Sequence, residues 1–344
     1  KPFGQTHLTV TPIGLGLAAL GRPGYINLGH AKDLNHSYDV TAMEAHAHTV
    51  LDAAWDAGIR YFDVARSYGR AEAFLASWLT SRHIDPTSVT VGSKWGYTYT
   101  ADWQITVSAG QKHEVKDHTL PVLQRQWQES QKLLGNQLNL YQIHSATLDS
   151  GVLDDTAVLT HLAHLRSSGT VIGLSLSGTG QADTLWRALE IAFDGRLLFG
   201  SVQATWNILE QSATAVLTAA HEAGLGVIVK EALANGRLTT RNQSPDFQPQ
   251  MHTLTRLAQQ HHTTVDALAL TAVLHQPFVD VVLSGAAQTD HLLSNVAALQ
   301  VEWRPELAEI LLGMGEETAV YWQTRSNLPR SEEHTSELQS PCNL

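Results

Sequence analysis

An acid, a phenol, an amine and an imidazole follow short apolar runs at widely separated points of the chain. These residues are Asp63, Tyr68, Lys94 and His144. The runs are IRYFD at 59–63, SVTVGSK at 88–94 and LNLYQIH at 138–144. If they are parallel strands that end on one face, the four groups converge there. The combination predicts a proton-transfer site with the phenol as the acid, and we expect the neighbouring ammonium to lower the phenol pKa from about 10.

Strand-like and helical segments alternate along the chain and must position these groups. After IGLGL at 13–17, the expected strands are 59–65, 88–94, 138–144, 170–176, 199–205, 225–230 and 280–284. The expected helices are 42–57, 117–134, 154–168, 181–194, 211–223 and 288–299. Such alternation is typical of a parallel sheet. Eight strand–helix units favour a closed, eight-stranded (β/α)8 TIM barrel, and we expect an N-terminal β-hairpin-like lead-in before it.

No linker rich in Pro, Gly or Ser divides the chain, so we expect a single domain over 1–330. The stretch 235–250 is interpreted as a long βα loop. Residues 331–344 are polar and aperiodic, which predicts a non-native or disordered tail. The only cysteine, Cys342, lies in this tail. Disulfides, thiolate catalysis and Cys-ligated zinc are therefore not expected, and a cytoplasmic location is the simplest expectation.

The overall charge restricts the class of partner. The net charge is −11 and 43% of residues are hydrophobic. An acidic chain is a poor ligand for nucleic acid or an anionic membrane, and no apolar run approaches the roughly 20 residues of a membrane span. We therefore expect a small-molecule substrate, and the oligomeric state stays open.

Two motifs in the sequence suggest other chemistry and are rejected. Gly14, Gly16 and Gly21 have the spacing GxGxxxxG, and no helical pattern opens directly after them, so a dinucleotide fingerprint is not expected. HEVKDH at 113–118 places its histidines five residues apart, which on a helix would direct them away from a shared metal. No metal site is predicted.

The segment AGIRYFDVARSYGRAE at 57–72 resembles the signature of the aldo-keto reductase family, with Lys94 in VGSKWG and His144 in LYQIHS in matching order. The resemblance covers about 8–325. It implies a barrel that binds a nicotinamide cofactor without a Rossmann domain and transfers a hydride to or from a small aldehyde, ketone or alcohol. It also implies that Tyr68 is the general acid, that Lys94, paired with Asp63, lowers its pKa, and that His144 orients the carbonyl.

The resemblance also implies a set of cofactor-binding residues, which are Ser175, Gln203, Trp206, Lys230, Ser284, Gly285, Ala286, Gln288 and Asn295. Ser175 and Gln203 would bind the carboxamide, and Trp206 would stack on the nicotinamide ring or belong to the core. Lys230 would contact the diphosphate or form a structural ion pair. The turn at 284–286 would bind phosphate and is followed by Gln288 and Asn295 at the adenosine end.

The cofactor and the substrate are less sharply defined. The family resemblance favours NADP(H), yet 286–289 (AAQT) carries no cation for a 2′-phosphate, so we expect NAD(H) to be accepted too. Arg237 and Arg241 are candidate cations from the loop at 235–250. Trp95 and Tyr97, with further aromatics after Lys94, predict an aromatic-walled pocket for a small carbonyl compound or its alcohol.

Two other functions remain open from the sequence. One is a cofactor-binding regulatory or interaction subunit on the same fold, although such a subunit has no need of all four polar groups. The other is a barrel lyase or isomerase in which Lys94 forms a Schiff base. Trapping with borohydride separates that chemistry from hydride transfer.

Overall fold

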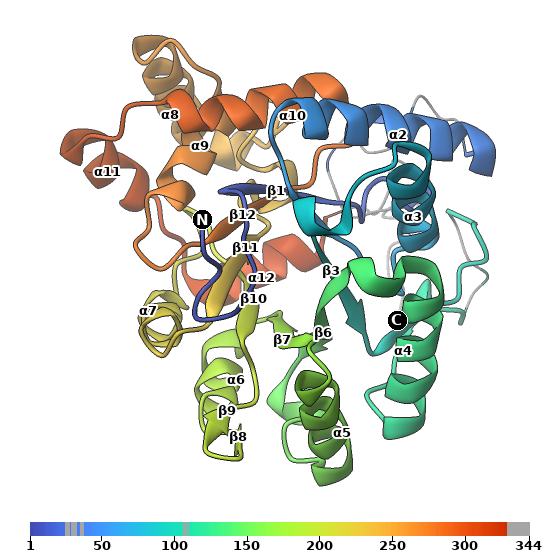
Figure 1. The fold of residues 1–344 in the computed structure, drawn as a ribbon. Helices are drawn as coiled ribbons and strands as arrows, with labels where there is room; N and C mark the ends of the chain where they lie inside the picture. The colour runs from blue at the N-terminus through green and yellow to red at the C-terminus, as the bar shows by residue number, and fades with distance from the viewer. Residues whose placement is uncertain (25–27, 29–32, 35–37, 106–107, 109, 329–344) are drawn as a thin grey trace, which may run out of the picture.

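The computed structural model describes residues 1–344 except 25–27, 29–32, 35–37, 106–107, 109 and 329–344. Its centre is a closed barrel of parallel strands, in the order β1-β12-β11-β10-β7-β6-β3-β2. The strands are β1 (Ile13–Gly16), β2 (Tyr61–Asp63), β3 (Thr90–Trp95), β6 (Leu138–Ala146), β7 (Val171–Leu176), β10 (Ser201–Thr205), β11 (Gly226–Lys230) and β12 (Val281–Ser284). The predicted (β/α)8 barrel is thus confirmed (Figure 1).

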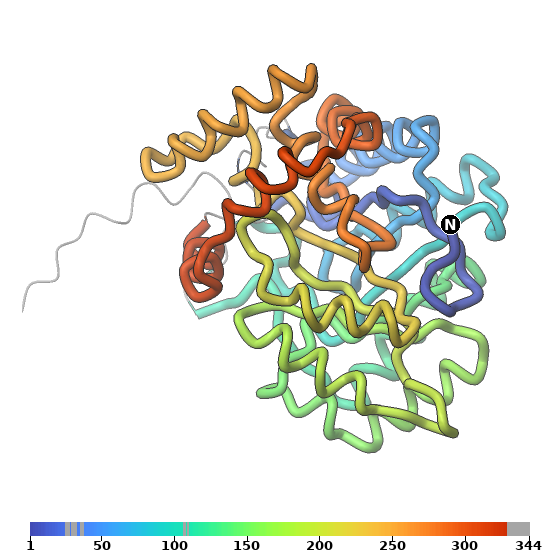
Figure 2. Tube along the Cα trace, turned by 90° about the vertical axis from the view of Figure 1, so that its left-hand side faces the viewer, coloured from blue at the N-terminus to red at the C-terminus, as the bar shows by residue number. Residues whose placement is uncertain are grey.

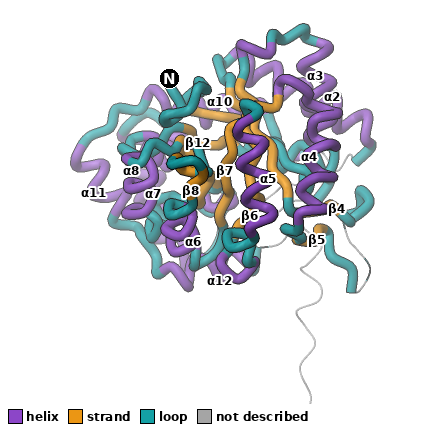
Figure 3. Tube along the Cα trace, turned by 60° about the horizontal axis from the view of Figure 1, so that its bottom comes forward, coloured by secondary structure: helices purple, strands orange, loops and turns teal. Residues whose placement is uncertain are grey.

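Helices surround the strands on the outside, as Figure 3 shows with helices in purple and strands in orange. They are α2 (Val40–Asp56), α3 (Ala71–Ser81), α4 (Leu120–Leu134), α5 (Thr156–Ser167), α6 (Gln181–Ala188), α7 (Thr214–Glu222), α8 (Gln248–Gln260), α9 (Val265–Leu274), α10 (Thr289–Val296), α11 (Pro305–Leu312) and α12 (Thr318–Ser326). Local signals explain several boundaries. Asp155, for example, caps α5 by accepting hydrogen bonds from the backbone of Ala157 and Val158.

Some elements differ from the sequence expectation. The helix expected over 181–194 ends at Ala188, and the chain turns into a two-stranded hairpin of β8 (Ala192–Phe193) and β9 (Arg196–Leu197). Helix α3 was not expected. It packs between α2 and α4, and its apolar residues are buried. The expected loop at 235–250 forms two short 3-10 turns before α8 begins at Gln248.

The N-terminal lead-in covers the end of the barrel at which the strands begin. Pro2 and Thr9 form an antiparallel bridge, which is the expected hairpin-like arrangement. The bridge places the fully buried Phe3 under the strands, where its ring lies 6.4 Å from that of Tyr61. A side chain at Gly226 would come within 2.4 Å of the Phe3 ring, so this strand needs a glycine at that position. The lead-in therefore covers the amino-terminal end of the barrel, and the carboxyl ends of the strands form its open end, where a cavity lies.

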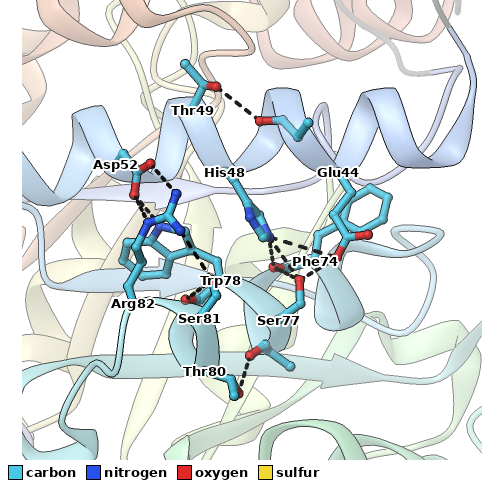
Figure 4. Close-up of polar contacts among 12 residues, drawn as sticks. Glu44, His48, Thr49, Asp52, Phe74, Ser77, Trp78, Thr80, Ser81 and Arg82 are labelled. Atoms are coloured by element: carbon cyan, nitrogen blue, oxygen red, sulfur yellow. Dashed lines mark hydrogen bonds and ion pairs between the residues drawn. The ribbon is translucent and has the colours of Figure 1, made fainter.

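Helices α2 and α3 are joined by polar contacts as well as apolar packing (Figure 4). Asp52 accepts hydrogen bonds from Trp78 Nε1 at 2.8 Å and from Arg82 Nε at 2.9 Å. His48 Nε2 lies 2.9 Å from Ser77 Oγ. This histidine therefore has a structural partner between two helices, away from the strand ends.

The last two helices pack on α8 and α9 through a separate apolar cluster. Phe247, Met251, Leu268, Leu311 and Tyr321 belong to it. In Figure 2 these C-terminal helices (red) lie beside the orange segment that contains α8. Within the part of the chain that the structure describes, no helix is long and apolar enough to cross a membrane.

Two glycines of the GxGxxxxG motif, Gly14 and Gly21, allow close packing. A Cβ at Gly14, in β1, would lie 2.6 Å from the Tyr61 ring. A Cβ at Gly21 would lie 2.3 Å from the carbonyl oxygen of Tyr68. Gly21 O also accepts a hydrogen bond of 2.7 Å from the backbone of Arg70. The loop after β1 is therefore pressed against the loop that carries Tyr68.

We expect Gly21→Ala to lower the free energy of unfolding by about 1–3 kcal/mol, because backbone atoms must move to admit the methyl group. Gly180→Ala is the matched control, since its Cβ would have nothing within 4 Å and its φ is −87°. Denaturant unfolding of both variants measures the difference. Equal stability of Gly21→Ala and the parent protein would contradict this packing.

Candidate active site

The polar residues predicted from the sequence lie at the open end of the barrel. Asp63 is the last residue of β2, Lys94 lies near the end of β3, and His144 lies near the end of β6. Tyr68 is on the loop after β2. A cavity of about 520 Å³ opens here, and Asp63, Tyr68 and His144 line it. Lys94 lies beneath these residues and is fully buried.

Lys94 and Asp63 form a buried ion pair at the floor of the cavity. The Lys94 ammonium contacts Asp63 Oδ2 and donates a 3.0 Å hydrogen bond to the carbonyl oxygen of Val64. The other carboxylate oxygen accepts from Gln203 Nε2 at 2.9 Å and from the Tyr61 hydroxyl at 3.4 Å. The exposed fractions of the two charged side chains are 0% and 2%, so the pair is held by direct contacts rather than by water.

Tyr68 lies between Lys94 and His144. The Lys94 Nζ atom is 4.8 Å from the centroid of the Tyr68 ring. The His144 ring meets the same phenol edge-on, with centroids 5.5 Å apart. Ser67 Oγ lies 3.3 Å from His144 Nδ1, and the Tyr97 ring lies 5.0 Å from the imidazole. The structure therefore brings the four predicted groups together in one place.

The expected effect of Lys94 on the phenol needs correction. Burial raises the pKa of Tyr68 well above its usual value, and the Asp63 carboxylate raises it further, while the Arg22 guanidinium opposes this. Asp63 pairs with the Lys94 ammonium, so the positive charge near the phenol is largely balanced. Burial, followed by the positive charges of Lys94 and Lys230, lowers the pKa of His144 well below its usual value. At neutral pH the site therefore holds a protonated phenol and a neutral imidazole.

Most residues that the family resemblance assigned to the cofactor line the same cavity. They are Gln203, Lys230, Ser284, Gly285, Ala286 and Asn295. Asn295 forms a hydrogen bond of 2.8 Å with the Ser284 hydroxyl. Ser175 is buried beside the cavity, where its hydroxyl accepts a 2.8 Å hydrogen bond from the backbone of Ser145. Gln288 is outside the cavity lining, and its amide donates to the carbonyl oxygen of Asp33.

Two of the aromatic residues belong to the core: Trp206 takes the second of its two expected places, and Trp95 differs from the expected pocket wall. Trp206 belongs to the core, with its ring 5.8 Å from Phe278 and its Nε1 donating to Thr214. Its side chain is buried and lies outside the cavity lining. Trp95 is also fully buried in the core, where it meets His118, whereas Tyr97 lines the cavity as expected.

The predicted Lys230 lies in the cavity wall in an ion pair, together with an arginine that the sequence reasoning missed, Arg325. Lys230 Nζ donates to Thr205 Oγ1 at 2.8 Å and lies 3.7 Å from Glu231 Oε1. Arg325, from α12, donates to Glu231 through Nε at 2.9 Å. Burial is the main cause that lowers the pKa of Lys230, to about 8. Arg325 lies almost a hundred positions along the chain from Glu231, and no local pattern links them.

A second charged group lies at the end of the cavity near β12. Arg241 forms an ion pair with Asp33 through its terminal nitrogens Nη1 and Nη2, and its Nη2 lies 3.1 Å from His291 Nε2. Arg237, the other candidate cation, is paired with Glu316 and is outside the cavity lining. The motif HEVKDH also lacks a metal-binding arrangement, because Glu114 to Lys116 form strand β5. The described residues contain no group of three or more potential metal ligands.

The cavity fits an extended nicotinamide cofactor. It runs from Tyr68 and His144 to the backbone turn at Ser284, Gly285 and Ala286. Backbone N–H groups at such a turn, which precedes α10, can hold a phosphate. The volume lies in the range of sites for molecules of this kind.

Comparison with known proteins agrees with this geometry. A sequence model of the aldo/keto reductase family matches residues 12–311. The chain is 28% identical to D-threo-aldose 1-dehydrogenase of a Pseudomonas species, covering 90% of this chain and 98% of that protein. It is 25% identical to pyridoxal 4-dehydrogenase of Microbacterium luteolum, covering 86% and 91%. It is 24% identical to NADH-specific methylglyoxal reductase of Escherichia coli, covering 92% and 98%.

A solved structure of similar fold is the holo form of an aldo-keto reductase from Bacillus halodurans. It is 19% identical, has a TM-score of 0.68, and covers 94% of this chain and 98% of its own. The barrel, the buried ion pair beneath a tyrosine and a histidine, and the match over residues 12–311 lead to one conclusion. The chain belongs to the aldo/keto reductase family of nicotinamide-dependent oxidoreductases, which act on aldehydes, ketones and alcohols.

Proposed function

We propose that this enzyme interconverts a small carbonyl compound and its alcohol, with Tyr68 as the general acid and base. The observation that carries the proposal is the juxtaposition of Tyr68 with the Lys94–Asp63 pair and with His144 in one cavity. A protonated phenol can donate to a carbonyl oxygen while a neutral imidazole supplies a second hydrogen bond.

Each residue has a separate task in this scheme. When bound, the cofactor supplies or accepts the hydride. Tyr68 gives its proton to the oxygen that becomes the alcohol, and it takes the proton back in the oxidative direction. His144 orients that oxygen. Lys94, whose ammonium lies 4.8 Å from the ring centroid, balances the Asp63 charge that would otherwise oppose formation of the phenolate. Asp63 fixes the position of Lys94.

The position of Lys94 argues against Schiff-base chemistry. Its amine is fully buried and already bound to Asp63 and Val64. A lyase needs a neutral amine that a substrate carbonyl can reach. A purely regulatory role is also disfavoured, because burying an ion pair is costly and a binding module gains nothing from it.

We further propose that NAD(H) and NADP(H) are both accepted with weak discrimination. Arg241 supplies a cation at the end of the cavity near the turn at 284–286, but its two terminal nitrogens, Nη1 and Nη2, already donate to Asp33. A carboxylate here repels a 2′-phosphate, while it can accept a hydrogen bond from a ribose hydroxyl. The two effects of Arg241 and Asp33 oppose each other for NADP(H).

Tyr68→Phe should lower the rate of carbonyl reduction by about 10²–10⁴-fold, because the acid is lost. Cofactor affinity should stay within a few-fold, since the proposed cofactor contacts come from other strands. Absorbance of the reduced cofactor measures the rate, and quenching of tryptophan fluorescence measures binding. The control is Tyr141→Phe, a buried phenol outside the cavity lining. Retention of more than a tenth of the parent rate would remove Tyr68 from its role.

The pH dependence follows from the direction of the Tyr68 pKa. Because that pKa is raised, the phenol keeps its proton as pH increases, and the form needed for reduction persists. At saturating cofactor, where loss of the Lys230 charge near pH 8 does not limit cofactor binding, we expect kcat/KM for reduction to stay level from pH 6 to about 9. Oxidation needs the phenolate and should rise steadily over the same range. A fall in the reduction rate with a midpoint below pH 9 would contradict the raised pKa.

Asp33→Asn should increase affinity for NADPH by about tenfold, because Arg241 becomes available to the phosphate, and should not increase affinity for NADH, because a charged acceptor for the ribose hydroxyl is lost. Glu316→Gln is the control, since it removes the carboxylate partner of Arg237, which is outside the cavity lining. Fluorescence titration with both reduced cofactors gives the ratio. If the ratio of NADPH to NADH affinity is unchanged in Asp33→Asn, this end of the cavity does not contact the 2′ position of the cofactor.

A further inference from the structure

An ion pair forms part of the cavity wall next to Tyr68. Arg22, on the loop after β1, donates from Nη1 to Glu114 Oε2 at 2.8 Å and to the carbonyl oxygen of Ser67 at 3.1 Å. Glu114 belongs to β5, which pairs with β4 (Tyr97–Tyr99) in the hairpin over the barrel mouth. Arg22 and Glu114 both line the cavity. The proposed proton transfer does not use either residue.

The pair lies at the reacting end of the cavity. The Arg22 guanidinium carbon is 5.9 Å from the centroid of the Tyr68 ring. Both charges also act on the Tyr68 phenol: Arg22 lowers its pKa and Glu114 raises it. The proposed phosphate-binding turn begins at Ser284, the last residue of β12, whereas Arg22 lies after β1 and Glu114 lies in β5. A substrate whose carbonyl reaches Tyr68 therefore extends past Arg22 and Glu114.

The chemistry of the pair selects among substrates. A carboxylate only accepts hydrogen bonds and a guanidinium only donates them, whereas a hydroxyl group does both. Glu114 keeps about 21% of its side chain exposed, so its carboxylate can accept from a ligand. An alkyl or aryl group placed here would remove water from two charges without replacing it. An anionic group gains little from Arg22, whose charge Glu114 balances, and is repelled by Glu114.

We propose that the Arg22–Glu114 pair makes the enzyme selective for neutral substrates that carry hydroxyl groups next to the reacting carbon. Glu114 accepts a hydrogen bond from a substrate hydroxyl, and Arg22 holds Glu114 in place. Among small carbonyl compounds, a hydroxyaldehyde or a sugar is therefore preferred to an alkyl aldehyde and to a 2-oxo acid. This inference rests on the proposed oxidoreductase function of the same site.

The test compares glyceraldehyde with propanal, which has the same carbon chain without the two hydroxyl groups, and with the anion glyoxylate. Glu114→Gln keeps the shape of the side chain and removes its charge. The control is Glu316→Gln, since the Arg237–Glu316 pair has a similar burial, with 10% and 21% of its side chains exposed. Reduction is followed by absorbance with saturating cofactor. Binding of xylitol, with 1-pentanol as its apolar counterpart, is measured separately by saturation-transfer NMR with the reduced cofactor alone, so that neither alcohol can be oxidised.

In the parent enzyme, kcat/KM for glyceraldehyde should exceed the values for propanal and glyoxylate by at least about tenfold. In Glu114→Gln the ratio of kcat/KM for glyceraldehyde to that for propanal should fall about tenfold. The cause is a higher KM for glyceraldehyde, because its hydrogen bond to a charged acceptor is lost. The propanal rate should not fall, because propanal has no hydroxyl group that Glu114 could bind, and Glu316→Gln should alter the rate with neither substrate. Xylitol should bind the parent and lose its signal in Glu114→Gln.

Two results would overturn the inference. One is an unchanged preference in Glu114→Gln, and the other is equal binding of xylitol by this variant and the parent. Failure of the proposed function is distinguishable, because then no carbonyl compound is reduced, while the xylitol experiment still reports whether Glu114 binds hydroxyl groups.

Discussion

The buried ion pair of Lys94 and Asp63 is the interaction on which the rest of the site depends. Charges this deep in a protein are tolerated only when each has a partner and further hydrogen bonds. Strand β2 supplies the carboxylate, β3 the ammonium, and β10 the amide of Gln203 that holds the second carboxylate oxygen. Closure of the barrel brings the side chains of these three strands together at the bottom of the cavity. Loss of either charge would leave the other buried without compensation.

The same pair explains why the groups above it are uncharged. Because Asp63 balances Lys94, burial dominates for Tyr68 and raises its pKa, and burial is also the main cause of the lowered pKa of His144. Charge near the reaction is thus confined to the floor and to paired groups in the wall. The residues of the pairs Arg22–Glu114, Glu231–Arg325 and Asp33–Arg241 lie outside the barrel strands, in the segments after them, in the β4–β5 hairpin and in α12. The barrel therefore fixes the proton chemistry, while its loops decide what can enter.

The sequence was informative where a residue type is tied to a regular element. Strand ends at Asp63, Lys94 and His144 were predictable because buried parallel strands are short apolar runs with a polar terminus. Contacts between segments far apart in the sequence were not predictable. Arg325, for example, reaches Glu231 because α12 packs on α8 and α9. Trp206 shows a different difficulty, since a tryptophan just after a strand can face the core or the cavity, and only packing against Phe278 decides which. The pKa of Tyr68 also depends on burial and on the Lys94–Asp63 pairing, neither of which a sequence pattern measures.

The central claim is that the Lys94–Asp63 pair lies beneath a phenol that keeps its proton. NMR of protein labelled with ¹³C at the tyrosine ζ carbon reports that proton directly, and the Tyr68 signal is identified by its absence from Tyr68→Phe. The account predicts a shift that stays at the phenol value up to about pH 10, since burial raises the pKa of Tyr68 above its usual value. A Tyr68 signal that titrates with a midpoint below about pH 9 would contradict it, because the ammonium would then act on the phenol as a free charge.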